Sequence, residues 1–311
     1  MLLYNLSIQE YNLVLRSFFF CALLLLSSTS QAQVTVLTSI KPLQFIAEAI
    51  TQGQATTEVL LPPGASPHHY ALRPSDITRI EQADLVYWIG NDLETFLAKP
   101  LARRKLPTVA IQKLPTIQLL HFSTEHDAHD EHDHDHAPGS IDTHLWLSTQ
   151  NALIIAEKMA NDLAKLDPNN ATLYQANLTQ FKQALALTNT HIKQQLGNTK
   201  QKPFFVFHEA FNYFEQAYGL KHAGVFAISA EIQPGARHVQ KMRQQLAAAG
   251  ASCVFTEPPL QPRLASTLSA DLPVTLVELD PLGTHLISSP SAYPQLLENL
   301  AKNISQCLNQ E

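Results

Sequence analysis

The sequence predicts an α/β fold of two (βα)4-like lobes with parallel sheets, joined by one long rigid backbone helix. Short, almost continuously apolar runs alternate with helix-like stretches from Val34 onward, and the same alternation returns in the second half. A strand-free helical region separates the two halves. Strands that are apolar on both faces are typical of parallel sheets covered by helices on both sides.

The N-terminal lobe is predicted over residues 33–166. Its strands are indicated by four apolar runs: VTVLTSI from Val34, TTEVLLP from Thr56, DLVYWIG from Asp84 and PTVAIQK from Pro107. The intervening stretches have helical periodicity and are opened by Pro, Ser or Asp, as helix starts commonly are: PLQFIAEAI, PSDITRIEQA and LETFLAKPLARRK.

A linking helix is predicted over residues 167–198. From Ser148 to Leu196 the chain carries helix-forming Ala, Leu, Gln and Lys and no strand signal. Asp167-Pro168 interrupts this region and restarts the helix, because Pro suits a first helical turn. The stretch from Asn169 to Leu196 would form a rod of roughly 40 Å. Lobes joined in this way should move little relative to each other.

The C-terminal lobe is predicted over residues 199–311. Four further runs indicate its strands: PFFVFHE from Pro203, KHAGVFAI from Lys221, ASCVFTE from Ala251 and PVTLVEL from Pro273. The helical stretch PGARHVQKMRQQLAAAG ends on Gly250, a residue typical of helix C-termini. A final amphipathic helix is expected from Ser291 to Gln310.

The composition indicates a globular protein with ample core. Of the 311 residues, 45% are hydrophobic and 15% charged, and the net charge is −6. That charge gives no electrostatic reason to expect nucleic acid or an anionic membrane surface as partner. No segment after the N-terminus is long and apolar enough to cross a membrane, so we expect a soluble mature protein.

The first 32 residues are predicted to be a signal peptide. Arg16 precedes a short apolar run, FFFCALLLL, which is too short to span a bilayer, and Ser30-Gln31-Ala32 provides small residues for cleavage. The stretch before Arg16 is long for a signal peptide and carries the acidic Glu10, so translation could start downstream of Met1. A buried N-terminal helix is the alternative. A signal peptide would place the mature protein in the periplasm.

Two of the three cysteines remain after such cleavage. Cys21 lies in the apolar run and has no lipoprotein-type context. Cys253 and Cys307 form an even pair in an oxidising compartment, which favours a disulfide over two free buried thiols.

The segment from His121 to Gly139 is acidic, of low complexity and rich in histidine: His126, His129, His132, His134 and His136. It cannot bury a core, so we predict a mobile loop that binds additional metal weakly. The alternative is a solvated acidic linker.

Several of the 14 histidines follow predicted strands, where α/β proteins bind ligands. His68 and His69 come after a strand and a Pro/Gly turn, His144 precedes a helix, and His208 ends PFFVFH. Adjacent side chains rarely point the same way, so one of His68 and His69 is expected to bind metal. With both cysteines bonded, a zinc site would need His with carboxylate or water.

Five motifs occur in order along the chain: PPGASPHHYALRPSD, DTHLWLS, FFVFHEAF, SAEIQPGA around Glu231, and ELDPLGT around Asp280. Together they resemble the metal-specific solute-binding proteins of ABC importers, most closely the zinc-uptake branch. The resemblance covers essentially the whole mature chain. It implies a high-affinity periplasmic zinc carrier that delivers Zn²⁺ to an ABC-type permease in the inner membrane. We expect this carrier to be a monomer and not an enzyme.

Carried over by position, the family's metal-binding histidines fall on His68, His144 and His208. The acidic residue that precedes the first of them in several relatives is Pro67 here. The resemblance therefore leaves Asp280 or a water as the fourth ligand. It also implies the Cys253–Cys307 disulfide.

Manganese-type relatives carry Glu where this chain has His208, and imidazole favours zinc over manganese. A manganese or iron carrier of the same fold remains the closest rival. A free-standing zinc buffer that uses the histidine-rich loop alone is another.

A zinc hydrolase is less consistent with the sequence, because Asn212 replaces the second His of an HExxH motif and the motif follows a strand. Among the other histidines only His285, near ELDPLGT, is a candidate for a position close to the metal. Ordinary structural or surface roles are expected for the rest: His121, His191, His222 and His238.

Overall fold

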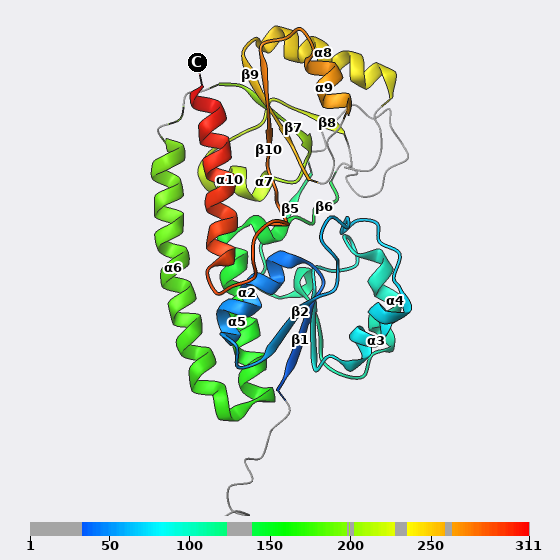
Figure 1. Ribbon diagram of the computed structural model, residues 1–311, viewed down its shortest axis with the longest axis vertical. Helices are drawn as coiled ribbons and strands as arrows, with labels where there is room; N and C mark the ends of the chain where they lie inside the picture. The colour runs from blue at the N-terminus through cyan, green and yellow to red at the C-terminus, as the bar shows by residue number, and fades with distance from the viewer. Residues whose placement is uncertain are drawn as a thin grey trace, which may run out of the picture. The chain divides into compact units, whose positions relative to one another are not determined.

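Two four-stranded parallel sheets form the framework (Figure 1). The computed structural model describes residues 33–122, 139–197, 199, 202–227, 235–258 and 263–310. The predicted signal peptide, residues 126–136 and Glu231 lie outside these ranges. All eight predicted strands are present, and both sheets are parallel, as the sequence indicated.

The first sheet has the order β2-β1-β3-β4. Its strands are short and lie close to the predicted apolar runs: β1 (Thr35–Thr38), β2 (Thr56–Val59), β3 (Leu85–Trp88) and β4 (Thr108–Ala110). Figure 1 shows α2 (Lys41–Thr51) on one side of this sheet and α3 (Pro74–Gln82) and α4 (Thr95–Arg103) on the other. This division follows from right-handed crossovers, because the chain reverses its direction across the sheet after β2.

The second sheet repeats this topology with the order β8-β7-β9-β10. Its strands are β7 (Phe204–His208), β8 (Gly224–Ala227), β9 (Ser252–Thr256) and β10 (Val274–Glu278). The connecting helices are α7 (Asn212–Tyr218), α8 (Ala236–Ala249) and α9 (Arg263–Ser269). Helix α8 ends before Gly250, whose φ of 71° favours glycine, as predicted for this C-terminus.

Long helices connect the two sheets. The predicted helical region forms α5 (Thr149–Leu166), a 3-10 turn η3 (Pro168–Asn170) and α6 (Ala171–Gly197), so the break at Asp167-Pro168 is confirmed. Helix α6 lies beside α5, α2 and the last helix, α10 (Ala292–Asn309) (Figure 1).

Smaller elements lie between β4 and α5. They are the 3-10 turns η1 (Ile111–Lys113) and η2 (Leu145–Leu147), and an antiparallel pair formed by β5 (Leu120–His121) and β6 (Ile141–Asp142). His121, expected at the start of a loop, is therefore part of β5. The segment between these two strands lies mostly outside the described residues.

Two hydrophobic clusters form the core of the described chain from Val34 onward. The larger one joins the first sheet, α5, α6 and α10 to residues of β7, β9 and α7, including Phe204, Val206 and Phe255. The smaller one lies under α8 and α9 and contains Phe205, Phe226, Met242 and Leu246. Alternate residues of β7 therefore enter different clusters, because successive side chains of a strand point to opposite faces. The larger cluster makes the two sheets parts of one packed body.

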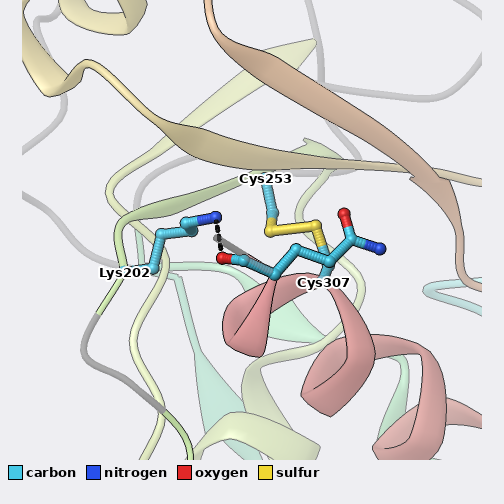
Figure 2. The surroundings of a disulfide bond; sticks show 4 residues. Lys202, Cys253 and Cys307 are labelled. Carbon is cyan, nitrogen blue, oxygen red and sulfur yellow. Dashed lines mark hydrogen bonds between the residues drawn. A yellow bond between two sulfur atoms is a disulfide. The ribbon is translucent and has the colours of Figure 1, made fainter.

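A disulfide joins Cys253 of β9 to Cys307 of α10, as the sequence indicated (Figure 2). Both cysteines belong to the larger hydrophobic cluster. Next to the disulfide, the Lys202 ammonium donates a hydrogen bond to the carbonyl oxygen of Gln310 at 2.9 Å. The bond and this contact attach the C-terminal helix to the second sheet.

None of the helices within the described ranges is long and apolar enough to cross a membrane.

Candidate metal centre

Three buried histidines meet between the two sheets. Each of His68, His144 and His208 offers a ring nitrogen, and these three atoms lie within 4.8 Å of one another. The ring centroids are 4.8 to 5.5 Å apart. All three side chains are buried. Within the described part of the chain, they form the one group of His, Cys, Asp or Glu with the spacing needed to hold a metal ion.

His208 is placed directly by a strand. It is the last residue of β7, a fully buried strand that pairs with both β8 and β9. Its position at the carboxyl end of a central strand is where α/β sheets bind ligands. The sheet hydrogen bonds therefore fix the backbone from which this imidazole projects.

His68 is placed by a loop. After β2, the backbone N–H groups of Leu60 and Leu61 still bond to the carbonyls of Thr38 and Ser39. The chain then turns at Pro62, whose carbonyl accepts a hydrogen bond from the N–H of Ala65. The N–H of His68 donates to the Ser66 hydroxyl at 3.1 Å.

The end of the His68 loop is anchored to α3. The Asp76 carboxylate accepts hydrogen bonds from the Tyr70 hydroxyl at 3.0 Å and from the N–H of Arg73 at 2.9 Å. The Arg73 guanidinium in turn donates to the Tyr70 hydroxyl. Tyr70, Arg73 and Asp76 thus connect the segment that carries His68 to the first turn of a helix.

His144 is placed by contacts with the second half of the chain. The Tyr213 hydroxyl of α7 donates to the carbonyl of Asp142 at 2.9 Å. The Trp146 indole donates to the carbonyl of Pro281 at 2.8 Å, and the Tyr293 hydroxyl of α10 donates to the carbonyl of Trp146 at 2.6 Å. His144 therefore comes before the linking helices in sequence but is held by residues that follow them.

Two of the imidazoles have a carboxylate next to their Nδ1 atom. The Asp142 carboxylate lies 2.8 Å from Nδ1 of His144 and also accepts the N–H of His144 at 3.0 Å. The Glu257 carboxylate lies 3.1 Å from Nδ1 of His208. A carboxylate on Nδ1 favours the tautomer with its proton there, which leaves Nε2 free to bind a metal.

Burial keeps two of the imidazoles neutral, those of His68 and His144. It lowers the pKa of His68 well below its usual value, and the charges that His208, His144 and His69 would carry lower it further. Burial and then His208 lower the pKa of His144 in the same direction. Neutral imidazole is the form that binds metal, so these two side chains are ready to bind at neutral pH.

Burial also raises the pKa of Asp142 to about 7, against opposing hydrogen bonds from the His144 backbone and the Asn212 side chain. Sequence reasoning missed both Asp142 and Glu257. Asp142 precedes His144 by two residues, and Glu257 directly follows β9, so each carried a signal at a strand end.

The other predicted site residues are not members of this group. His69 is exposed and its ring is not part of the group. The Asp280 carboxylate accepts hydrogen bonds from the N–H groups of Leu282 and Thr284 and from the Thr284 hydroxyl. It therefore caps its own loop. His285 is exposed.

The histidines predicted to form a secondary metal loop are not among the described residues: His126, His129, His132, His134 and His136. Outside the cluster, the Nδ1 of His222 lies 3.0 Å from the Glu215 carboxylate, and His238 contacts the carbonyl of Val225. His191 lies 4.0 Å from Glu298.

The near-match to HExxH has the wrong geometry for that motif. His208 is in β7, and Asn212, which begins α7, donates a hydrogen bond to Glu209 at 3.1 Å. In a true motif of this type both histidines lie on one helix.

Residues 36–307 match the family described as ZnuA, zinc-uptake complex component A, periplasmic. The chain belongs to this family. It is also similar to the high-affinity zinc uptake system protein ZnuA of Yersinia pestis, with 40% identity over 302 residues. That alignment covers 92% of this chain and 95% of the relative.

Solved structures show the same fold. A crystal structure of ZnuA has a TM-score of 0.75 and 24% identity, and covers 89% of this chain and 100% of its own. The solute-binding protein FpvC of Pseudomonas aeruginosa in complex with Mn²⁺ also has a TM-score of 0.75, at 21% identity, and covers 89% and 98%. Membership of the ZnuA family makes this chain a metal-binding solute-binding protein, as the sequence motifs indicated.

Proposed function

We propose that this protein captures Zn²⁺ in the periplasm through His68, His144 and His208 and delivers it to an ABC-type permease of the inner membrane. The buried cluster of three imidazoles is the observation that carries the proposal. Three protein ligands with an open fourth position suit zinc, which is bound by His nitrogen at about 2.0 to 2.1 Å.

The donor set favours zinc over manganese. Mn²⁺ prefers carboxylate, carbonyl and water oxygens, whereas imidazole suits zinc and copper. The fold alone does not select the metal, because FpvC was solved with Mn²⁺. The name of the Yersinia pestis relative, a zinc uptake protein, supports the same choice.

A water is our proposal for the fourth ligand. Both oxygens of Asp280 already accept hydrogen bonds from the loop that follows it. Oδ1 accepts two of these bonds and Oδ2 one, so direct ligation would be limited to the remaining lone pair of Oδ2, whereas a water is under no such constraint. Pro67, buried beside His68, provides no ligand oxygen in its side chain.

Transport as a carrier is consistent with the geometry. His208 ends a strand of the second sheet and His68 follows a strand of the first, so the metal would lie at the junction of the two sheets. Delivery to a permease is supported by the family description, which names a zinc-uptake complex and a periplasmic component.

Calorimetric titration of metal-stripped mature protein with zinc and with manganese tests the proposal. We expect one tight zinc and much weaker manganese. His68→Ala, His144→Ala and His208→Ala should each lose orders of magnitude in zinc affinity, and His69→Ala is the matched control that should not. A tighter site for manganese would favour the rival carrier, and a larger loss for His69→Ala than for His68→Ala would overturn the ligand set.

A further inference from the structure

The two carboxylates behind the imidazoles come from different parts of the fold. Asp142 ends β6 and contacts His144, and Glu257 directly follows β9 and contacts His208. Their side chains are 0% and 10% exposed, respectively. Neither contact is made by the imidazole nitrogen that would face a metal.

Burying two carboxylates beside neutral imidazoles costs free energy unless a positive charge compensates them. The three imidazoles contribute no charge in their metal-binding form. A divalent cation at the centre of the cluster would stabilise the ionised form of both carboxylates at short range and in a medium of low dielectric constant. With both carboxylates ionised, one divalent ion matches the formal charge of the buried site.

The position of Asp142 is itself fixed. The Tyr213 hydroxyl holds its backbone carbonyl, and the N–H of His144 donates to its carboxylate. Glu257 is held by the end of β9, which pairs with β7, the strand that carries His208. The backbone that carries each carboxylate is thus held by hydrogen bonds of the fold, which favours a constant orientation of the two imidazoles.

We propose that Asp142 and Glu257 are positioning residues that hold Nε2 of His144 and His208 toward the metal and make the site selective for a divalent over a monovalent cation. This inference rests on the proposed function. It assigns the charge balance of the site to residues that do not themselves bind the metal.

Substitutions that keep the acceptor oxygen but remove the charge separate the two effects. Asp142→Asn and Glu257→Gln retain an oxygen for Nδ1–H, so the histidines stay oriented. We expect zinc affinity to fall by about 10- to 100-fold, the usual cost of losing such a partner. Affinity for Cu⁺, measured anaerobically against a chelating dye, should fall less, so that the ratio of zinc to Cu⁺ affinity decreases. The visible spectrum of bound Co²⁺ should stay tetrahedral.

Asp142→Ala and Glu257→Ala remove the acceptor as well. These variants should bind zinc more weakly than the Asn and Gln variants, and their Co²⁺ spectrum should change. Glu215→Gln is the matched control, because Glu215 is a buried carboxylate on Nδ1 of His222, which is not in the cluster. It should leave zinc affinity and the zinc-to-Cu⁺ ratio unchanged.

Zinc affinities of Asp142→Asn and Glu257→Gln within about twofold of the parent would overturn the inference. An unchanged zinc-to-Cu⁺ ratio would overturn the charge selectivity even if zinc affinity fell. If the parent protein itself binds no zinc, the proposed function fails instead, so the two failures are distinguishable. Circular dichroism of every variant identifies any loss of affinity that comes from unfolding.

Discussion

The two lobes have the same strand topology but use its most favourable position differently. In each sheet the chain reverses direction between two central strands, β1 and β3 in the first and β7 and β9 in the second. Ligands of α/β proteins usually bind at the carboxyl ends of such strands. In the second sheet this position holds His208 and Glu257. In the first sheet a buried carboxyl group, that of Glu94, occupies it.

Glu94 fills the crevice of the first sheet. Its carboxylate accepts the N–H groups of Ile89 and Gly90, which follow β3, at 2.8 and 3.2 Å. Burial raises its pKa to about 7, and the Ser39 hydroxyl and these N–H groups oppose the shift. The N-terminal lobe instead supplies His68 from the loop after β2. Shared topology thus determines where a ligand can bind, and the local side chains determine whether one does.

The largest effect that we expect concerns the pH dependence of zinc binding. The lowered pKa values of His68 and His144 mean that both stay neutral at their ordinary pKa of 6.5. Protonation of these two imidazoles should therefore reduce zinc affinity little from pH 8 to 6.5. Below the lowered pKa values the affinity should fall by about tenfold per pH unit for each imidazole that becomes protonated. Competition with a chelator of known pH dependence measures this, and a fall of about tenfold per pH unit for each imidazole that begins directly below pH 6.5 would show that these pKa values are not lowered.

The disulfide distinguishes the lobes, since the N-terminal lobe contains no cysteine. Replacing Cys253 and Cys307 by Ser should lower the free energy of unfolding by about 4 kcal/mol in the chain-entropy model for a separation of 54 residues. Denaturant unfolding measures the total. Hydrogen exchange should show lost protection in β7 and β9 before β1 and β3. Equal loss in both sheets would mean that the lobes unfold as one unit.

Glu94→Gln tests the raised pKa of the buried Glu94 carboxyl group in the N-terminal lobe. The folded-state pKa of about 7 lies above the ordinary 4.5, so the folded protein holds this proton more tightly than the unfolded chain. That contribution is fully present below pH 4.5 and is lost as pH rises through 7. The variant should remove the loss and exceed the parent in stability at pH 8 by up to about 3 kcal/mol. Thermal unfolding from pH 4 to 8 measures it; parallel curves for the two proteins would contradict the assignment.

Tyr70→Phe should have the smallest effect. It removes the hydroxyl that joins Asp76 and Arg73 and so loosens the loop that carries His68. A lost hydrogen bond of this kind costs about 1 kcal/mol, and zinc affinity should fall by less than about tenfold. Tyr218→Phe, which removes a hydroxyl from α7, is the control and should leave zinc affinity unchanged. Equal effects of the two variants would show that the His68 loop needs no such anchor.

Local patterns predicted most of the fold. Apolar runs and helical periodicity located all eight strands, the break at Asp167-Pro168 and the C-terminal helix, because each depends on neighbouring residues. The bounds of α7 and α9 were not predicted, and neither was the β5–β6 pair. All of these elements are short, and tertiary contacts stabilise them more than local preference does.

For the site, the sequence by itself determined the candidates: histidines at strand ends and a pair of cysteines. The structure brings His68, His144 and His208 together in a group that does not include His69 or Asp280. The roles of the three histidines as ligands stay a proposal. Only the tertiary structure decided that Glu257 meets His208, that Trp146 bonds to Pro281 and that Glu94 is buried. Such contacts depend on the order of strands in the sheets and on which helices cover them, whereas hydrophobic periodicity reports only which face of each element is buried.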